Sequence, residues 1–283
     1  IDIEIVTDAK DATKRILQID QPNLGLSREY LVKGLEDKGV KAYLKYMVDI
    51  AVFLGASEET ASDEMKKALN LEIEVAKISL PKEERRNKTA LYNLMTVKEI
   101  SALYPLPWGK YLNGIVPLVD DDLVNVAVPN YLNSLNTLLA STPVRTVANL
   151  MMWRHVQFSV DFMAEKAGDI KLEFDKVIKG QASKFPRWET CVKKTAGVDG
   201  NGETEEDYYF YNAEGSLTNA VGAMYAKKHF PVTAKKIIDE IVENIRKEFR
   251  LILEELDWMD EKTRARALEK ADLITPHIAY SKE

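Results

Sequence analysis

Residues 142–166 constrain the fold of this chain more than any other stretch, because they predict a helix with apolar side chains on two faces. Thr142 suits the N-cap position, and Pro143 loses no hydrogen bond at the first helical position. At about 3.6 residues per turn, the apolar positions of the two faces are Val147, Leu150, Met151, Phe158 and Phe162, and Met152, Trp153, Val156, Val160 and Met163. A helix of this kind is covered on most sides, so we expect it to be the central strut of a helical domain.

Three polar side chains, Asn149, Arg154 and His155, lie inside this apolar span. The structural interpretation of Arg154 is a guanidinium paired with Asp161 or with a carboxylate of a neighbouring helix, because an unpaired buried charge is too costly. The functional interpretation is a clamp for a substrate carboxylate. We favour the structural interpretation, and we expect His155 to be a hydrogen-bonded core histidine and not a ligand.

Helical patterns fill most of the remaining chain. Alternating apolar residues at 1–6 and 15–19 predict a β-hairpin, and 124–128 predicts a short strand. Apolar spacing and end signals predict further helices over residues 40–54, 57–80, 96–104, 129–140, 188–194, 216–230, 233–256 and 261–272. The expected fold class is therefore mainly α, a multi-helix lobe with a small N-terminal β-hairpin. No shift in composition marks a domain boundary, and the Gly-rich acidic stretch 197–215 is interpreted as a surface insertion in preference to a linker.

Length and charge limit the class of protein. A chain of 283 residues is long enough for one large domain or two. The net charge of −6 offers no basic surplus to neutralise phosphates, so nucleic acid is not an expected partner. No apolar run reaches the roughly 18 residues that a bilayer requires. The chain begins at Ile1 inside a predicted strand, which suggests a piece of a longer protein.

Residues able to carry catalysis or bind a metal are scarce. The three histidines, His155, His229 and His277, are far apart, so an H-E-x-x-H zinc helix is excluded within this chain. Cys191 is the only cysteine, which excludes a zinc site built from thiolates. A single cysteine is typical of a cytosolic protein or of an odd thiol whose partner lies elsewhere, and composition favours the first. A Cys191–histidine dyad lacks a local nucleophile signature. No glycine-rich phosphate-binding motif occurs.

Three further motifs have mainly structural interpretations. The acidic stretch 199–203 resembles a calcium loop, but Thr204 occupies the position where such a loop needs glycine, so a solvated loop is favoured. The acidic run 120–122 is interpreted as a solvated turn or a helix-capping run in preference to a metal site. Asn87 begins the sequence Asn-Lys-Thr, an acceptor for N-glycosylation in a loop-like stretch. We hypothesise that Asn87 carries sugar, although the triplet alone does not establish a secretory route.

Four ordered blocks resemble the neprilysin and endothelin-converting-enzyme family of zinc metallopeptidases. They are Asp-Gln-Pro-Asn-Leu-Gly-Leu at 20–26, Asn-Leu-Met-Met-Trp-Arg at 149–154, Asn-Ala-Val-Gly-Ala-Met-Tyr at 219–225 and Leu-Asp-Trp-Met-Asp at 256–260. The resemblance runs over nearly the whole chain, and it makes Asn149, Trp153 and Arg154 a structural signature. The segment around Cys191 also resembles the family's segment that carries a disulfide cysteine, with the partner cysteine outside this chain. That similarity replaces the cytosolic expectation.

The resemblance implies a parent enzyme that cleaves small peptides with zinc, built as two mainly helical lobes around a closed cavity. Residues 1–283 would be part of the smaller, N-terminal lobe, which caps the cavity and limits substrate size. The catalytic lobe of the same polypeptide would be its partner. The zinc ligands would lie beyond residue 283, so no catalytic residue, metal ligand or cofactor is expected in this chain.

The same resemblance places the parent at the extracellular face of the cell membrane or makes it a secreted glycoprotein. The stretch 197–215 is longer than the family pattern leads us to expect. The alternative hypothesis is a non-catalytic helical binding or decoy protein derived from that family.

Overall fold

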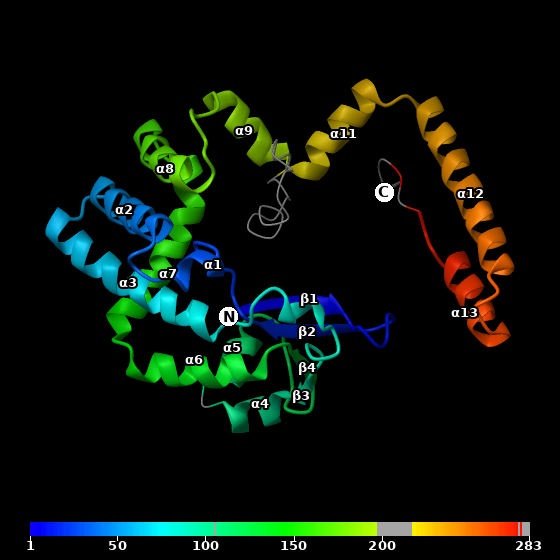
Figure 1. Cartoon of the computed structure of the whole chain (residues 1–283), viewed down its shortest axis with the longest axis horizontal. Coiled ribbons are helices and arrows are strands. Elements are labelled where there is room, and N and C mark those ends of the chain that lie inside the picture. Colours follow the sequence, from blue (N-terminus) through cyan, green and yellow to red (C-terminus); the bar gives the residue numbers. More distant parts are fainter. Residues whose placement is uncertain (105, 197–216, 277, 279–283) are drawn as a thin grey trace. The chain divides into compact units, whose positions relative to one another are not determined.

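The computed structural model describes residues 1–104, 106–196, 217–276 and 278 (Figure 1). The expected mainly α class is confirmed, with one small sheet near the N-terminus. The predicted loop 197–215, the calcium-like stretch within it and His277 lie outside the described residues. The chain divides into two compact units, Ile1–Lys184 and Phe185–Glu283, which we call unit 1 and unit 2.

The sheet of unit 1 is larger than the predicted hairpin. Strands β1 (Asp2–Thr7) and β2 (Arg15–Asp20) form that hairpin, with antiparallel pairing that runs from Asp2 opposite Asp20 to Thr7 opposite Arg15. The predicted strand at 124–128 is present as β4 (Leu123–Val126), which pairs parallel to β2. The three-residue strand β3 (Leu94–Thr96) completes the order β1-β2-β4-β3. Three residues are too few for a period-two pattern, which explains why the sequence did not indicate β3.

Helices form most of unit 1, and the sheet lies at its edge (Figure 1). They are α1 (Arg28–Leu31), α2 (Lys38–Phe53), α3 (Glu58–Ile78), the short 3₁₀ helix η1 (Glu84–Arg86), α4 (Val97–Leu103), α5 (Trp108–Asn113), α6 (Pro129–Ser141), α7 (Val144–Ser159), the 3₁₀ helix η2 (Val160–Phe162) and α8 (Glu165–Ile178). Side-chain caps begin several of them: Ser57 accepts from Thr60 N in α3, and Thr96 with Glu99 forms the predicted capping box of α4. Helix α2 packs on α3 and α8, and α3 packs on α7.

The core of unit 1 joins the sheet to these helices. Its largest fully buried apolar side chains are Trp108, Tyr43, Tyr131, Ile19, Leu31, Met47, Ile50, Leu69, Ile100 and Leu112. They come from β2 and from α1 to α6, so the sheet and the helices share one continuous hydrophobic core.

The predicted helix 142–166 is shorter than expected and has different ends. The Thr142 hydroxyl donates to the Leu138 carbonyl oxygen at the end of α6 (2.7 Å), so it caps nothing in α7. Helix α7 ends at Ser159, and after η2 the chain re-enters a helix as α8. Asp161 lies in this break, where it accepts a hydrogen bond from Lys171 of α8 at 2.5 Å. This tie across the turn favours a reversal of the chain over a continued helix.

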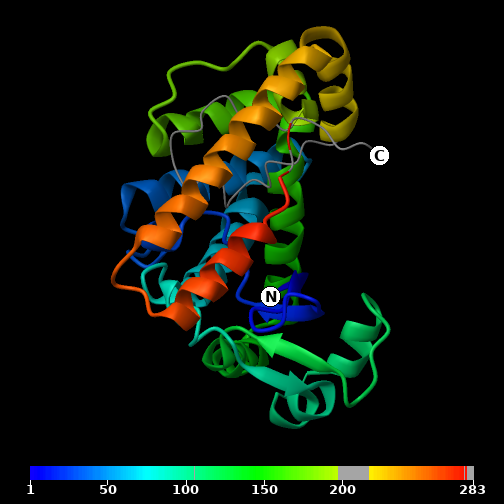
Figure 2. The same ribbon diagram turned by 90° about the vertical axis from the view of Figure 1, so that its right-hand side faces the viewer.

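The expectation that this helix is covered on most sides is also wrong. Trp153 is 3% exposed, but Met151 is 69% and Phe158 is 72% exposed, so α7 buries one face and presents an apolar face to solvent. His155 lies on the exposed side, so the core-histidine interpretation is wrong. Figure 2 shows α7, in green, as a long straight helix of unit 1. It is therefore a strut with a single packed side.

Unit 2 consists of helices in its described part. These are α9 (Arg187–Ala196), α11 (Thr218–His229), α12 (Val232–Glu255) and α13 (Glu261–Asp272), which match four predicted helices. Helix α9 contacts α11, and α12 packs against α13. Asp260 caps α13 by accepting from Thr263 N at 2.7 Å. Among the described residues of unit 2, only Leu253 and Ala271 are buried.

Candidate functional site

The described residues of unit 1 bring two of the sequence blocks together in a buried polar cluster. We define this cluster as Gly25, Tyr43, Glu72, Trp153, Arg154 and Gln157. Gly25 lies in the irregular segment after β2, Tyr43 in α2, Glu72 in α3 and the other three in α7. Gln157 lies four residues after Trp153 and three after Arg154, so it shares a helix face with each of them. Four segments that are distant in sequence therefore meet at one carboxylate.

Glu72 is the centre of the cluster and is only 2% exposed. Its Oε1 accepts from the Gly25 backbone N–H at 2.6 Å, and its Oε2 accepts from the Tyr43 hydroxyl at 3.1 Å. The Trp153 indole Nε1 donates to the same Tyr43 oxygen at 2.7 Å. Both carboxylate oxygens have hydrogen-bond partners, as a buried charge requires.

Arg154 supplies the positive charge nearest to Glu72. Its Nη1 lies 3.9 Å from Glu72 Oε1 and donates to Gln157 Oε1 at 2.8 Å, while its Nη2 donates to the Asn23 carbonyl oxygen at 3.2 Å. Gln157 Nε2 donates to the Gly25 carbonyl oxygen at 2.8 Å. Helix α7 thus holds the 23–25 segment by two carbonyl oxygens. The carboxylate beside Arg154 belongs to the neighbouring helix α3, and not to Asp161.

Gly25 is the closest approach of backbone to this cluster. A Cβ atom at this position would lie 1.8 Å from the Tyr43 hydroxyl oxygen, 2.5 Å from Arg154 Nη1 and 2.7 Å from Gln157 Oε1. All three separations are far below van der Waals contact, so no side chain larger than hydrogen fits without movement of the cluster. The glycine is required here by space, because its backbone must reach the Glu72 carboxylate.

Burial determines the protonation behaviour of the cluster. It raises the pKa of Glu72, and the Arg154 charge, the Gly25 N–H and the Tyr43 hydroxyl oppose that rise. Burial, followed by repulsion from Glu72, raises the pKa of Tyr43 well above its ordinary value. Neither group has the solvent access that acid–base chemistry on a substrate needs, so the arrangement acts as an internal cross-link between α2, α3, α7 and the 23–25 segment.

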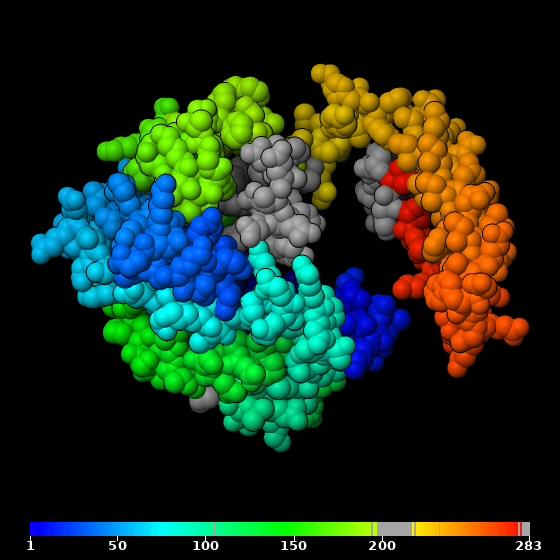
Figure 3. Space-filling view, in the orientation of Figure 1, coloured from blue at the N-terminus to red at the C-terminus, as the bar shows by residue number. Residues whose placement is uncertain are grey.

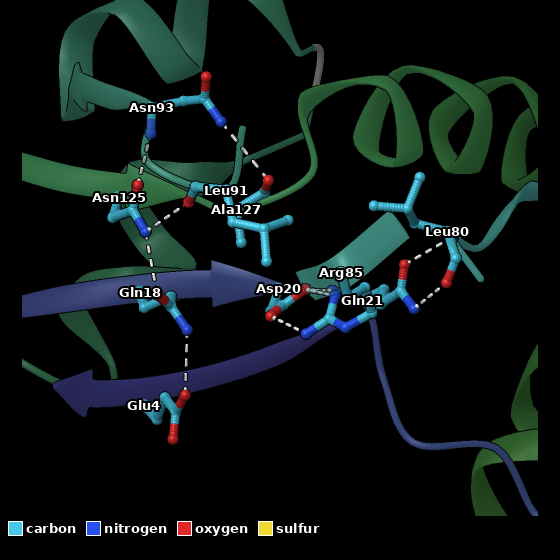
Figure 4. A network of polar contacts seen from close by, with 10 residues as sticks. All are labelled: Glu4, Gln18, Asp20, Gln21, Leu80, Arg85, Leu91, Asn93, Asn125 and Ala127. Atoms are coloured by element: carbon cyan, nitrogen blue, oxygen red, sulfur yellow. Dashed lines mark hydrogen bonds and ion pairs between the residues drawn. The ribbon is translucent and has the colours of Figure 1, made fainter. Parts of the chain in front are cut away.

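A second polar network lies at the end of the sheet (Figure 4). Asp20 accepts from Arg85 at 2.9 Å and 2.7 Å, which is a bidentate ion pair. Gln21 exchanges two hydrogen bonds with the Leu80 backbone, at 3.0 Å and 2.8 Å. The block 20–26 therefore has its first two residues tied to the chain after α3 and its sixth tied to the buried cluster. These contacts explain how the block 20–26 is closely packed although several of its residues are polar.

The other predicted residues lie elsewhere. Asn149 donates to the Glu64 carboxylate, which also accepts from Arg145 Nε at 2.8 Å, so it joins α7 to α3 outside the cluster. Asn87 is exposed in the connection after η1. Cys191 is exposed in α9 as a free thiol, and the expectation that its disulfide partner lies outside the chain stays a prediction.

Sequence reasoning missed Tyr43, Glu72 and Gln157. Tyr43 fits the apolar pattern that predicts the helix 40–54, and Glu72 is one of several acidic residues in α3, so neither stands out in the sequence. Gln157 lies three residues after Arg154, a spacing that could have identified it as a partner on the same helix face.

The described residues assemble no metal site: none of their His, Cys, Asp and Glu side chains form a group of three or more suited to an ion. Among the helices of the described ranges, none combines the length and apolar character needed to cross a membrane. The fold and the cluster together define a mainly helical lobe whose internal polar contacts fix its architecture.

Comparison with known proteins identifies the family to which this lobe belongs. The model of the N-terminal region of peptidase family M13 matches residues 1–281, and the chain belongs to that family. It is 40% identical to Neprilysin-2 of Drosophila melanogaster over 289 aligned residues, which cover all of this chain and 36% of that protein. It is 32% identical to endothelin-converting enzyme 1 of Mus musculus, covering 98% of this chain and 35% of that protein.

A solved structure has the same fold. The zinc metalloprotease of Mycobacterium tuberculosis, in its open state, superposes with a TM-score of 0.74 at 23% identity. The match covers 97% of this chain and 40% of that one. The chain therefore spans little more than a third of the length of the two curated relatives it matches.

Proposed function

We propose that this chain is the N-terminal, non-catalytic lobe of a neprilysin-like zinc metalloendopeptidase and caps the cavity in which small peptides are cleaved. The observation that carries the proposal is the match of residues 1–281 to the family's N-terminal model, by a chain that spans 36% of Neprilysin-2. The partner of this lobe is then the catalytic lobe of the same polypeptide. In this proposal the zinc ligands belong to that other lobe, as the family resemblance implies.

Within the complete enzyme, zinc would polarise the attacking water and the scissile carbonyl. The contribution of the present chain is mechanical: it closes the cavity with a rigid wall. The buried cluster supports this role, because buried or partly buried hydrogen bonds join α7 to Tyr43 of α2 and to Gly25, and Gly25 is in turn bonded to Glu72 of α3. A wall that keeps its shape excludes substrates by size, whereas a compliant wall would admit them.

The family also leads us to propose that the parent protein is located at the extracellular face of the cell membrane or is secreted. In that setting Cys191, which is exposed in α9, pairs with a cysteine outside this chain. Peptide mapping of the natural polypeptide without reduction tests this pairing. A reduced thiol at Cys191 in protein from the cell exterior would contradict it.

The complete natural polypeptide and the present chain should be compared for zinc content and peptide cleavage. We expect stoichiometric zinc and cleavage in the complete polypeptide only. Tight stoichiometric zinc in the present chain would overturn the assignment of the metal to the other lobe. A complete polypeptide without zinc or cleavage, but with peptide binding, would favour a non-catalytic binding protein derived from the family.

The capping role needs its own measurement, a series of substrates with one scissile sequence in peptides of increasing length. We expect kcat/KM to fall steeply once the peptide exceeds the size that the closed cavity admits. Equal cleavage of a short peptide and an unfolded protein that contains the same sequence would contradict the role of this lobe in size exclusion.

Arg154 allows the structural and substrate-binding interpretations to be separated. Arg154→Met leaves the Glu72 carboxylate buried without its nearest charge, so we expect a loss of about 3–5 kcal/mol in the free energy of unfolding. In the complete polypeptide, the folded fraction of the Arg154→Met variant should retain the wild-type KM for a peptide substrate. A raised KM with an unchanged denaturation midpoint would instead identify Arg154 as a clamp for a substrate carboxylate.

A further inference from the structure

The connection between α3 and β3 is held firmly at several points along its length. Leu80 is bonded twice by Gln21, and Arg85 forms the bidentate ion pair with Asp20 (Figure 4). These contacts fix the first half of the connection against the end of β2.

The second half of this connection is held by Asn125 of β4. Its Nδ2 donates to the Leu91 carbonyl oxygen at 3.1 Å, and its Oδ1 accepts from the Asn93 backbone N–H at 2.7 Å. Asn93 in turn donates from Nδ2 to the Val126 carbonyl oxygen at 3.1 Å. Only the middle of the connection is left without such anchors.

That middle carries Asn87, Lys88 and Thr89, the only Asn-x-Ser/Thr triplet in the sequence. All three residues are exposed, and the connection, turquoise in Figure 3, lies at the surface of unit 1. A turn follows directly, because Ala90 N donates to the Asn87 carbonyl oxygen at 3.1 Å and to its Oδ1 at 3.2 Å. In the described part of the chain, Asn87 Nδ2 donates no hydrogen bond.

We propose that Asn87 is an N-glycosylation site. The acceptor nitrogen is free, the triplet is exposed outside helix and strand, and anchors on both sides present it in a defined conformation. In the transfer, Asn87 Nδ2 forms a bond to the anomeric carbon of a lipid-diphosphate-linked oligosaccharide. The bond from that carbon to the phosphate oxygen breaks, Nδ2 loses one proton, and the lipid diphosphate leaves. The proposal rests on the extracellular or secreted placement in the proposed function.

A glycan at Asn87 is compatible with the fold, and it also restricts which surface of this chain can contact the catalytic lobe. The Asn87 side chain takes no part in the Asp20–Arg85 or Asn125 contacts, so an attached glycan leaves these contacts intact. A bulky, hydrated group at this turn also keeps the turn at the surface of the complete protein. The face that carries Asn87 is therefore excluded from any contact with the catalytic lobe.

The test uses the complete natural polypeptide, expressed from its own gene in eukaryotic cells. Peptide masses are measured before and after treatment with an amidase that removes N-linked glycans and leaves Asp at the attachment point. Thr89→Ser keeps the acceptor triplet, whereas Thr89→Ala and Asn87→Gln remove it, and within the described residues the Thr89 side chain makes no hydrogen bond. We expect glycan on wild type and Thr89→Ser only, with Asp at 87 after treatment. Unmodified Asn87 in wild type overturns the proposal.

Failure of this proposal and failure of the proposed function are distinguished by two further measurements. Zinc content and peptide cleavage of the same preparation report on the peptidase assignment, whatever the state of Asn87. A version with an added secretion signal tests whether the turn at Asn87 can accept a glycan once the protein enters the secretory route. If only that version is modified, the natural protein does not enter the secretory route, and both the glycosylation proposal and the extracellular placement are overturned while the peptidase assignment stands.

Discussion

The two units of the chain differ in how they bury apolar surface. Unit 1 encloses a continuous core from β2 to α8, and even charged and polar groups such as Glu72 and Asn125 are buried there with hydrogen-bond partners. Unit 2 has the longest helix of the described residues, α12, yet Leu253 is the only buried one among the side chains of this helix whose burial is described. Length and amphipathic pattern alone therefore do not produce a core.

The apolar side of α12 shows what is missing in unit 2. Five side chains recur every three or four residues along one stripe and are 47–63% exposed: Ile237, Ile241, Ile245, Phe249 and Ile252. Each such side chain would contribute about 1.5–3 kcal/mol on full burial. Within the described residues this gain is not realised, so unit 1 should be stable by itself, whereas unit 2 lacks the burial that a stable domain of its size needs.

The largest expected effect comes from expressing the units separately. Ile1–Lys184 should unfold in one cooperative transition, because it retains the entire described core. Phe185–Glu283 should keep helical signal but lose it gradually with urea, and its amides should exchange quickly. Circular dichroism in urea and hydrogen exchange test both expectations. A sharp transition in the isolated unit 2 would remove the contrast between the units.

Substitution of two glycines sharpens the same contrast. Gly25→Ala in unit 1 places a methyl group 1.8 Å from the Tyr43 hydroxyl, so we expect a loss at or above the upper end of about 1–3 kcal/mol. Gly222→Ala in α11 of unit 2 meets nothing within 4 Å and should be neutral or stabilise the helix by up to about 1 kcal/mol. Urea midpoints of the full chain measure both. Equal changes in the free energy of unfolding for the two variants would show that the cluster around Gly25 accommodates a methyl group at little cost.

A pair of tryptophans gives a smaller difference. Trp153→Phe removes the donor to Tyr43 and part of a side chain that is 3% exposed, so we expect a loss of about 2–3 kcal/mol. Trp258→Phe changes a side chain that is 70% exposed in unit 2, and its effect should stay within about 0.5 kcal/mol. Thermal unfolding of both variants tests the ranking. It would be contradicted by a loss at Trp258 that matches the loss at Trp153.

Much of the fold was predictable because its signals are local. Apolar periodicity located most of the long helices but not α8, the Thr96–Glu99 capping box fixed the start of α4, and alternation identified the β1–β2 hairpin. The end of α7 was not predictable in this way. The apolar pattern continues through Phe162, and only the tie between Asp161 and Lys171 reveals the turn. Periodicity also cannot tell a covered face from an exposed one, so Met151 and Phe158 were wrongly expected to be covered.

The polar cluster was predictable only in part. Trp153 and Arg154 were identified by resemblance, but Glu72 is separated from them by about eighty positions and lies in a helix with several exposed acids. Its burial depends on the Gly25 N–H, the Tyr43 hydroxyl and the Arg154 charge arriving from three other segments. The local sequence around Glu72 does not indicate these contacts, because tertiary packing determines them.

The smallest effect is the pH dependence of Glu72→Gln. Glutamine keeps an acceptor for Gly25 N–H and can donate to the Tyr43 oxygen, so we expect a stability within about 1.5 kcal/mol of wild type. Burial raises the folded-state pKa of Glu72, so above its ordinary value the folded chain retains a proton that the unfolded chain has lost. The unfolding free energy of wild type relative to the variant must then fall as pH rises through this interval.

Urea unfolding of both proteins from about pH 4 to pH 8 measures this difference directly. Glu248→Gln, which changes an exposed carboxylate of α12, controls for the loss of one negative charge in unit 2. A wild-type advantage that grows with pH would mean that the Arg154 charge and the two hydrogen-bond donors, Gly25 N–H and the Tyr43 hydroxyl, outweigh burial at Glu72. The cluster would then be held by the strength of its ion pair, and the difference between the units would be one of charge pairing as well as apolar burial.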